Sequence, residues 1–254
     1  MTAGVPSPGR FREIDGCFNF RDLGGYRAGD GWTVPWRRLY RADGLHRFSA
    51  GGRAAFGALG IVSVLDLRTG DEAGQCPWTP PDGWPGRRSH LPLLAGVPDW
   101  SGGDPGELNR DDFAAGHYLH IAEEGAAELG RAVRLLAEPG ALPAVFHCSA
   151  GKDRTGVLAA LVLRLLGVPA GAVADDYALS ERATARWEAS VAGGVPDDTL
   201  STWATVPPSL LRSDRETMLA FLRGIDERYG SVAGWAAARL GIGAADAERL
   251  RRAL

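Results

Sequence analysis

One cysteine and one arginine, Cys148 and Arg154, have the types and the spacing to do chemistry together. The apolar residues 143–146 before them predict a strand, and the apolar run 157–166 after them predicts a buried helix. A short loop between a strand and a helix N-terminus suits an anion, because backbone N–H groups converge there and the helix dipole favours negative charge. Arg154 adds a two-pronged contact to an oxyanion. The same positive field stabilises a thiolate, so Cys148 is predicted to be a nucleophile.

Length and composition set the remaining frame. The chain has 254 residues, of which 45% are hydrophobic and 23% charged, so it can bury a sizeable core. We expect a single domain over residues 1–254, with the Pro- and Gly-rich residues 1–10 as a flexible tail. The net charge of -3 gives no general attraction to nucleic acid or to anionic membrane. We therefore expect no nucleic-acid partner, and any anion site must be local.

The three cysteines, Cys17, Cys76 and Cys148, are odd in number and widely spaced. This pattern fits neither a disulfide framework nor a zinc site, and it favours a reducing cytoplasm. No metal ligands cluster, so we expect neither a metal nor a cofactor. The start of the sequence does not resemble a signal peptide, and no stretch approaches the roughly 18 apolar residues of a membrane span. No integral membrane association is expected.

Strand and helix patterns alternate along the chain, which predicts an α/β fold: a central, mostly parallel sheet surrounded by helices. The cysteine loop would then lie at the carboxyl end of its strand, where such sheets bind ligands. Trp78 and Trp84 are interpreted as covers for the core. The predicted strands cover 61–65 and an edge strand within 89–94, and the predicted helices cover 50–59, 107–138 with breaks at Gly116 and Gly125, 181–191, 214–228, 231–240 and 244–254.

Two irregular stretches are candidates for covering the site. Residues 95–106 are rich in Gly and Pro and carry Asp99 and Asp104, which is typical of a mobile element over a site. Residues 192–208 contain Trp203 and have little periodicity. They are either a lid or an ordinary surface connection, and the sequence leaves both open.

The motif His-Cys-x-x-Gly-x-x-Arg-Thr-Gly over 147–156 resembles the phosphate-binding loop of the cysteine-dependent protein tyrosine phosphatases. The resemblance to the bacterial tyrosine phosphatase family runs from about residue 12 to the last residue. It implies a phosphotyrosine protein phosphatase-like fold. The segments that carry it are 19–26, 39–43, 59–61, 66–68, 176–180 and 229–231.

The resemblance implies a role for each residue of the loop. The Cys148 thiolate would attack phosphorus and form a phosphocysteine intermediate, which water then hydrolyses. Thr155 would donate a hydrogen bond to the Cys148 sulfur and help it leave, whereas His147 would order the loop. The phosphate would be held by Ser149, Ala150, Gly151, Lys152, Asp153 and Arg154.

The general acid is where this sequence departs from the family pattern. In a member of the family an aspartate follows Phe-Pro soon after the strand corresponding to 90–93, and direct alignment places Ala95 there. A shift of four residues matches Val97-Pro98-Asp99, so Asp99 is the predicted acid. Asp104 and Asp153 remain alternatives, and Asp153 is otherwise expected to brace Arg154.

The expected substrates are phosphotyrosine proteins or peptides, with dual specificity for phosphoserine or phosphothreonine left open. The Ala-Gly-Lys-Asp-Arg wording also resembles loops of phosphoinositide phosphatases, where Lys152 would meet a second phosphate; otherwise Lys152 raises the pocket potential or points to solvent. A catalytically inactive, phosphate-binding adaptor is a third reading. It is disfavoured because Cys148, Arg154 and Thr155 are all present. By analogy with a family member, export without a signal peptide stays open as an alternative to the cytoplasm.

Overall fold

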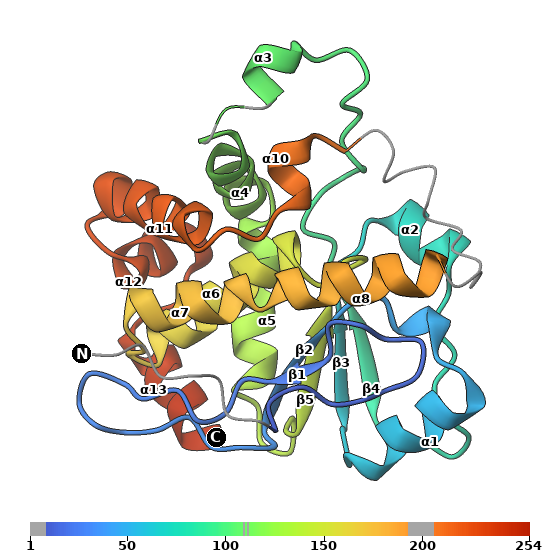
Figure 1. Ribbon diagram of the computed structural model, residues 1–254. Coiled ribbons are helices and arrows are strands. Elements are labelled where there is room, and N and C mark those ends of the chain that lie inside the picture. The colour runs from blue at the N-terminus through green and yellow to red at the C-terminus, as the bar shows by residue number, and fades with distance from the viewer. Residues whose placement is uncertain (1–8, 109, 111, 193–205) are drawn as a thin grey trace.

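A five-stranded sheet forms the centre of the molecule, with the strand order β1-β2-β5-β3-β4 (Figure 1). The computed structural model describes residues 9–108, 110, 112–192 and 206–254. β1 pairs antiparallel with β2, and every other neighbouring pair is parallel. The predicted α/β class with a mostly parallel sheet is confirmed. The strands are β1 Arg21–Asp22, β2 Leu39–Ala42, β3 Ser63–Asp66, β4 Arg87–His90 and β5 Ala144–His147.

Helices surround the sheet, with α1 and α2 on one side and most of the others on the opposite side (Figure 1). A single-turn 3-10 helix, η1, covers Leu45–Arg47, and a π-helical turn, η2, covers Ala236–Leu240. The α-helices are α1 Ala50–Ala58, α2 Gly70–Gln75, α3 Pro105–Leu108, α4 Phe113–Glu124, α5 Ala126–Leu136, α6 Asp153–Leu165, α7 Ala170–Ala178, α8 Ser180–Ala192, α10 Pro208–Leu211, α11 Arg215–Tyr229, α12 Val232–Trp235 and α13 Ala244–Ala253.

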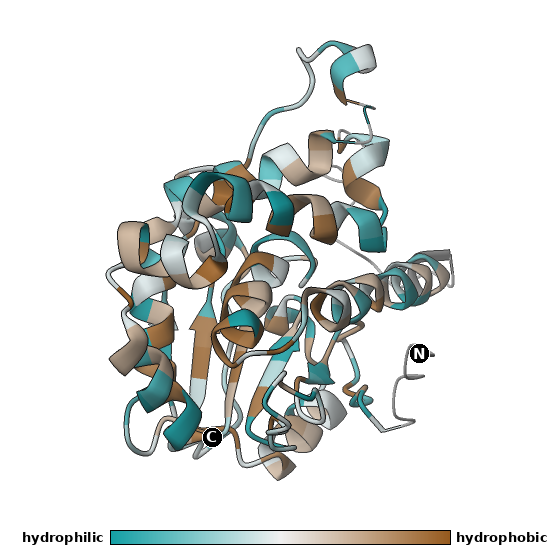
Figure 2. Ribbon diagram, turned by 90° about the vertical axis from the view of Figure 1, so that its left-hand side faces the viewer, coloured by the Kyte–Doolittle hydropathy of each residue, from teal (hydrophilic) through white to brown (hydrophobic). Residues whose placement is uncertain are grey.

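Alternation along the strands divides the core into two layers. In β5, Val145 packs in the smaller cluster under α1, whereas its neighbours Ala144 and Phe146 pack in the larger cluster under α4 to α7. Successive side chains of a strand point to opposite faces, so a central strand that is buried on both faces must be apolar throughout. Figure 2 shows the same arrangement, with brown, hydrophobic strands inside and more hydrophilic outer helices. Trp78 and Trp84 pack with their ring centroids 5.2 Å apart in or against the smaller cluster, as predicted.

One predicted helix break is wrong. Gly116 lies inside α4, and only Gly125 separates two helices of the predicted stretch. No atom lies within 4 Å of the place where a Gly116 side chain would stand. A glycine at an exposed helical position costs only about 1 kcal/mol relative to alanine, which the buried face of α4 outweighs. Among the described residues, no helix is long and apolar enough to cross a membrane.

The predicted N-terminal tail is wrong at its last residue. Arg10 is buried, donates hydrogen bonds to the carbonyl oxygens of Asp22 (2.7 Å) and Gly24 (2.8 Å), and lies 3.9 Å over the Tyr26 ring. These backbone acceptors, far along the chain, were not visible in the local composition. Residues 1–8 of the predicted tail lie outside the described residues. The same is true of 193–205, and therefore of most of the predicted lid.

Candidate active site

Cys148 lies at the carboxyl end of β5, between this strand and α6, as the sequence predicted. β5 is the middle strand of the sheet, and the cysteine is buried, with 1% of its surface exposed. In the part of the chain that the structure describes, the backbone N–H groups of residues 149–154 have no hydrogen-bond acceptor. Unsatisfied N–H groups in consecutive loop residues at a helix N-terminus can donate hydrogen bonds to an anion. The loop therefore has the character of an oxyanion cradle.

The carbonyl oxygens of residues 149–151 are held from behind the loop. The Gly44 N–H donates to the first of them at 2.9 Å, and the Asn19 amide donates to the next two at 3.1 and 3.0 Å. The Arg41 guanidinium donates to the third at 2.8 Å. Fixing the carbonyls on the outer side leaves the N–H groups of the loop for a ligand.

A buried carboxylate holds Arg41 in turn. Asp176 on α7 lies 2.7 Å from Arg41 and 3.2 Å from Arg21, and no more than 1% of any of the three side chains is exposed. Burial raises the pKa of Asp176, but the two guanidinium groups lower it by more. This pKa therefore lies well below the usual range of an aspartate. Segments far apart in sequence thus meet at one ion pair behind the phosphate loop.

Gly151 is required by the turn of the loop. Its φ is +65°, a conformation that favours glycine, and a Cβ here would stand 2.4 Å from the carbonyl oxygen of Ala42. The close approach lets the loop pack directly on the end of β2. Any larger residue at this position would push the loop away from the strand.

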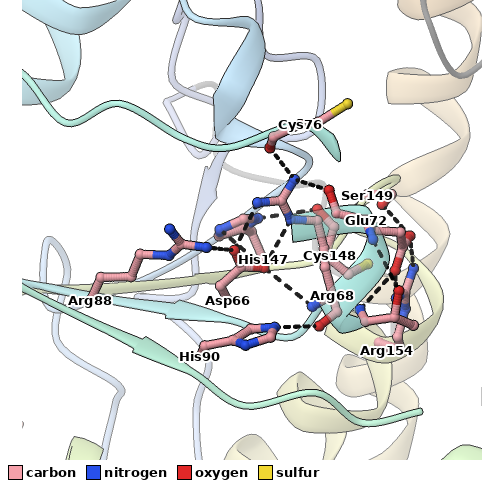
Figure 3. Close-up of polar contacts among 11 residues, drawn as sticks. Asp66, Arg68, Glu72, Cys76, Arg88, His90, His147, Cys148, Ser149 and Arg154 are labelled. Carbon is pink, nitrogen blue, oxygen red and sulfur yellow. Dashed lines mark hydrogen bonds and ion pairs between the residues drawn. The ribbon is translucent and has the colours of Figure 1, made fainter. Parts of the chain in front are cut away.

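A carboxylate that the sequence analysis did not single out orients Arg154. Glu72 on α2 accepts from both ends of the guanidinium, at 2.5 and 2.9 Å, and from the Ser149 hydroxyl at 2.5 Å (Figure 3). Burial raises the pKa of Glu72, but the hydrogen bonds and charge of Arg154 outweigh it and lower this pKa to about 2. The Thr69-x-x-Glu72 capping box was the available signal, since it places a glutamate in the first turn of a helix.

Behind the cysteine lies a second buried network (Figure 3). Asp66 accepts from Arg68 at 2.8 and 2.9 Å and from Arg88 at 2.8 Å. The His147 ring lies 3.8 Å from Asp66 and 3.1 Å from the Cys148 carbonyl oxygen. Burial lowers the pKa of His147, which favours its neutral form. This histidine faces the interior of the fold, and the structure gives it contacts that order the loop.

The sequence also matches the model of a known protein family. The family model described as "Tyrosine phosphatase family" matches residues 12–254. The chain belongs to this family. The matched region includes Cys148, Gly151 and Arg154, which carry the resemblance of the loop.

Two curated relatives extend over most of the phosphatase chain. The triple specificity protein phosphatase PtpB of Mycobacterium tuberculosis is 30% identical over 96% of this chain and 98% of its own. A putative tyrosine-protein phosphatase of Cupriavidus necator is 28% identical over 86% of this chain and 80% of its own. Among solved structures, TpbA of P. aeruginosa covers 85% of this chain at 16% identity, with a TM-score of 0.34 that is too low to support a conclusion.

Lys152 and Asp153 have partners other than those expected from the sequence. The buried Lys152 ammonium donates to the carbonyl oxygens of Leu210 and, at 3.2 Å, Arg212, so it does not point to solvent. Asp153 accepts from the Tyr118 hydroxyl at 2.6 Å and lies 3.5 Å from the Lys152 nitrogen. The hydrogen bonds to the Arg154 guanidinium come from Glu72, and a bracing role of Asp153 stays a prediction.

The three aspartates considered for the proton donor lie in different surroundings. Asp99 and Asp104 are exposed, and each accepts from the backbone N–H two residues further on, at 2.9 Å. The bond from Ser101 lowers the pKa of Asp99. Asp153 lines the cavity over the phosphate loop together with Arg154, whereas Asp99 and Asp104 do not. Burial raises the pKa of Asp153, but the Lys152 charge, followed by smaller contributions, outweighs this and lowers it.

The cavity over the loop measures about 130 Å³. Trp100 and His117 line it and also line an adjoining cavity of about 470 Å³ under α3. Burial lowers the pKa of His117 to about 4, so the ring is neutral at pH 7. Apolar side chains form much of the remaining wall of this cavity: Leu94, Val97, Pro98, Ile121, Val206, Leu210 and Leu211.

Thr155 is buried, and in the described part of the molecule its hydroxyl has no hydrogen-bond partner. Its donation to the Cys148 sulfur stays a prediction. No group of three or more His, Cys, Asp or Glu side chains suited to a metal ion occurs among the residues that the structure describes.

Proposed function

We propose that this protein hydrolyses the phosphate monoester of phosphotyrosine in proteins or peptides, through a phosphocysteine intermediate. The observation that carries the proposal is the buried Cys148 beside a loop whose N–H groups lack acceptors, with Arg154 locked by Glu72 at the rim. The phosphate loop and Arg154 would therefore both be fixed in place before the substrate arrives. Preorganised donors of this kind stabilise the charge of a phosphoryl group in transfer.

In the first step, the Cys148 thiolate attacks phosphorus and the S–P bond forms as the P–O bond to the tyrosine ring breaks. The phenolate leaves with a proton from a general acid. In the second step, water attacks phosphorus and gives a proton to the carboxylate left by the first step, the S–P bond breaks, and inorganic phosphate leaves as the thiolate and the general acid are restored. Arg154 and the backbone N–H groups of residues 149–154 hold the phosphoryl oxygens throughout.

For the general acid, the geometry favours Asp153 over Asp99 and Asp104, because Asp153 alone of the three lines the cavity. Its lowered pKa describes the protein without substrate. A phosphate dianion is a like charge that favours the protonated carboxyl when it binds nearby. Asp99 keeps the role only if residues 95–104 turn toward the cavity when substrate binds.

The apolar wall supports an aromatic substrate. Its leucine, valine and isoleucine side chains line the same cavity as the charged loop, which suits a phenyl ring joined to a phosphate. The name of the mycobacterial relative, a triple specificity phosphatase, makes other monoesters candidates for this chain as well. In the described part of the chain Cys17, Cys76 and Cys148 form no disulfide, which fits a reducing compartment such as the cytoplasm.

The test is a side-by-side panel of a phosphotyrosine peptide, its phosphoserine and phosphothreonine counterparts, and a phosphoinositide, each with and without vanadate. We expect vanadate-sensitive release of phosphate with the highest kcat/KM for the phosphotyrosine peptide. Phosphopeptide binding without turnover would support the adaptor alternative. A higher kcat/KM for the phosphoinositide would support the lipid phosphatase alternative.

A further inference from the structure

We infer that Lys152 is a positioning residue that ties α10 to the phosphate loop and thereby shapes the wall of the substrate cavity. In this arrangement Lys152 gives its hydrogen bonds to the end of α10 and not to a second phosphate group, so we expect the site to bind one phosphoryl group on an apolar carrier. The inference rests on the proposed function, because it concerns the substrate of the same site.

The ammonium group of Lys152 already has partners within the protein. A lysine ammonium has three donors and no acceptor. Lys152 donates hydrogen bonds to the carbonyl oxygens of Leu210 and, at 3.2 Å, Arg212, and its nitrogen forms an ion pair with the Asp153 carboxylate at 3.5 Å. Only 5% of the residue is exposed. A buried charge needs such partners, so leaving them for a ligand would carry a desolvation cost.

The two carbonyl acceptors, of Leu210 and Arg212, belong to the C-terminal end of α10. The last carbonyls of a helix have no partner within the helix, and a cation there satisfies them. Two further hydrogen bonds hold α10 and the residues after it: the Ser209 hydroxyl donates to the Leu108 carbonyl oxygen at 2.5 Å, and the Ser213 N–H donates to Glu181 at 2.9 Å. Lys152 is the one of these anchors that comes from the phosphate loop itself.

The position of α10 decides the shape of the cavity. The helix lies beside α4 in Figure 1, and Val206, Leu210 and Leu211 from this segment line the same cavity as Arg154. A tether between residue 152 and the end of α10 therefore fixes the distance between the phosphate cradle and the surface that would contact the ring. A substrate with a second phosphate would have to withdraw Lys152 from these carbonyls and loosen the wall.

The experiment compares Lys152→Ala, Lys152→Arg and Ser209→Ala with the wild type. Hydrogen exchange of residues 206–213 reports on α10, and kcat and KM are measured with the phosphotyrosine peptide and the phosphoinositide. For Lys152→Ala we expect at least about tenfold faster exchange in 206–213, as loss of charged hydrogen bonds implies. We also expect the KM for the phosphotyrosine peptide to rise more than kcat falls. Lys152→Arg keeps the charge and donors and should recover most of both effects. Ser209→Ala loosens the same helix without touching the loop, so it should raise exchange and KM in the same direction.

Two results would overturn the tether. One is unchanged exchange of 206–213 in Lys152→Ala. The other is a selective loss of phosphoinositide turnover in that variant, which would make Lys152 a ligand of a second phosphate. Failure of the proposed function looks different: the wild type would release no phosphate from the phosphotyrosine peptide, whereas the exchange experiment would still report on α10.

Discussion

The two rims of the substrate cavity are built in opposite ways. The phosphate loop is fixed by buried contacts from distant segments, above all Arg41 and Asp176, of which no more than 1% is exposed. The other rim is the loop that contributes Val97, Pro98 and Trp100 to the cavity, and its Asp99 and Asp104 are exposed and accept hydrogen bonds from residues two positions further on. The phosphate side is therefore preorganised, whereas the loop that follows β4 depends on local turns. A site of this kind fixes the chemistry and leaves the fit to the rest of the substrate adjustable.

Removing the nucleophile should have the largest effect. For Cys148→Ser we expect kcat with an aryl phosphate to fall by about 10⁴-fold or more, because a hydroxyl in place of the thiolate is a far weaker nucleophile. Steady-state release of inorganic phosphate measures it. Cys76→Ser is the matched control, because Cys76 makes no disulfide among the described residues and does not line the cavity. Turnover that survives in Cys148→Ser would refute the covalent mechanism.

The proton donor should come from the fixed rim and not from the exposed one. For Asp153→Asn we expect kcat with phenyl phosphate to fall by about 10² to 10⁴, the usual worth of a general acid. A substrate with a better leaving group, p-nitrophenyl phosphate, should lose much less. Asp99→Asn should leave both rates close to wild type. The opposite pattern, with a leaving-group-dependent loss in Asp99→Asn alone, would transfer the role to residues 95–104.

Adjacent aspartates on α7 give a test of the fixed rim through stability. Asp176→Asn removes the partner of two buried arginines, and we expect the free energy of unfolding to fall by about 3 to 5 kcal/mol. Asp175 forms a surface ion pair with Arg215 at 2.7 Å, so Asp175→Asn should cost less than about 1 kcal/mol. Urea denaturation measures both. Equal losses in the two variants would show that the buried ion pair does not fix the loop.

Glu72 should give the smallest effect, which depends on pH. Glu72→Gln removes the carboxylate that orients Arg154. We expect kcat/KM to fall by about 10 to 100-fold at pH 7, since a catalytic group that is held less accurately reduces rates on this scale. The pKa of Glu72 is lowered to about 2 in the folded protein, from an ordinary value of 4.5. Its contribution to stability is therefore complete above pH 4.5 and is lost as pH falls toward 2.

Urea denaturation of the wild type and Glu72→Gln across this pH range checks the second point. The difference in their free energies of unfolding should shrink as the solution becomes more acidic. A difference that stays constant down to pH 2 would mean that Glu72 is not held as a carboxylate by Arg154.

The sequence was enough to predict the sheet class, the helices near 50–59 and 214–228, and the place of Cys148 between a strand and a helix. These features depend on local periodicity and turn residues. The family resemblance was confirmed as well. That the whole chain is one domain stays a prediction.

What could not be read from the sequence depends on contacts between distant segments. Glu72 is a local capping residue by pattern, and only the packing of α2 against the loop brings it to Arg154. Lys152 was expected at the phosphate or in solvent, because nothing in the sequence relates residue 152 to the carbonyl of residue 210. Arg10 was assigned to a tail for the same reason. Periodicity describes which face of an element is buried, but not which other element covers it.

The ion pair behind the phosphate loop also has a consequence for synthesis on the ribosome. Residues 21 and 41 leave the exit tunnel long before residue 176, yet Arg21 and Arg41 find their carboxylate only when α7 emerges. A nascent chain that ends before α7 carries the nucleophile and Arg154 but lacks the counter-charge that holds the loop. The cell therefore meets a complete catalytic loop only late in translation.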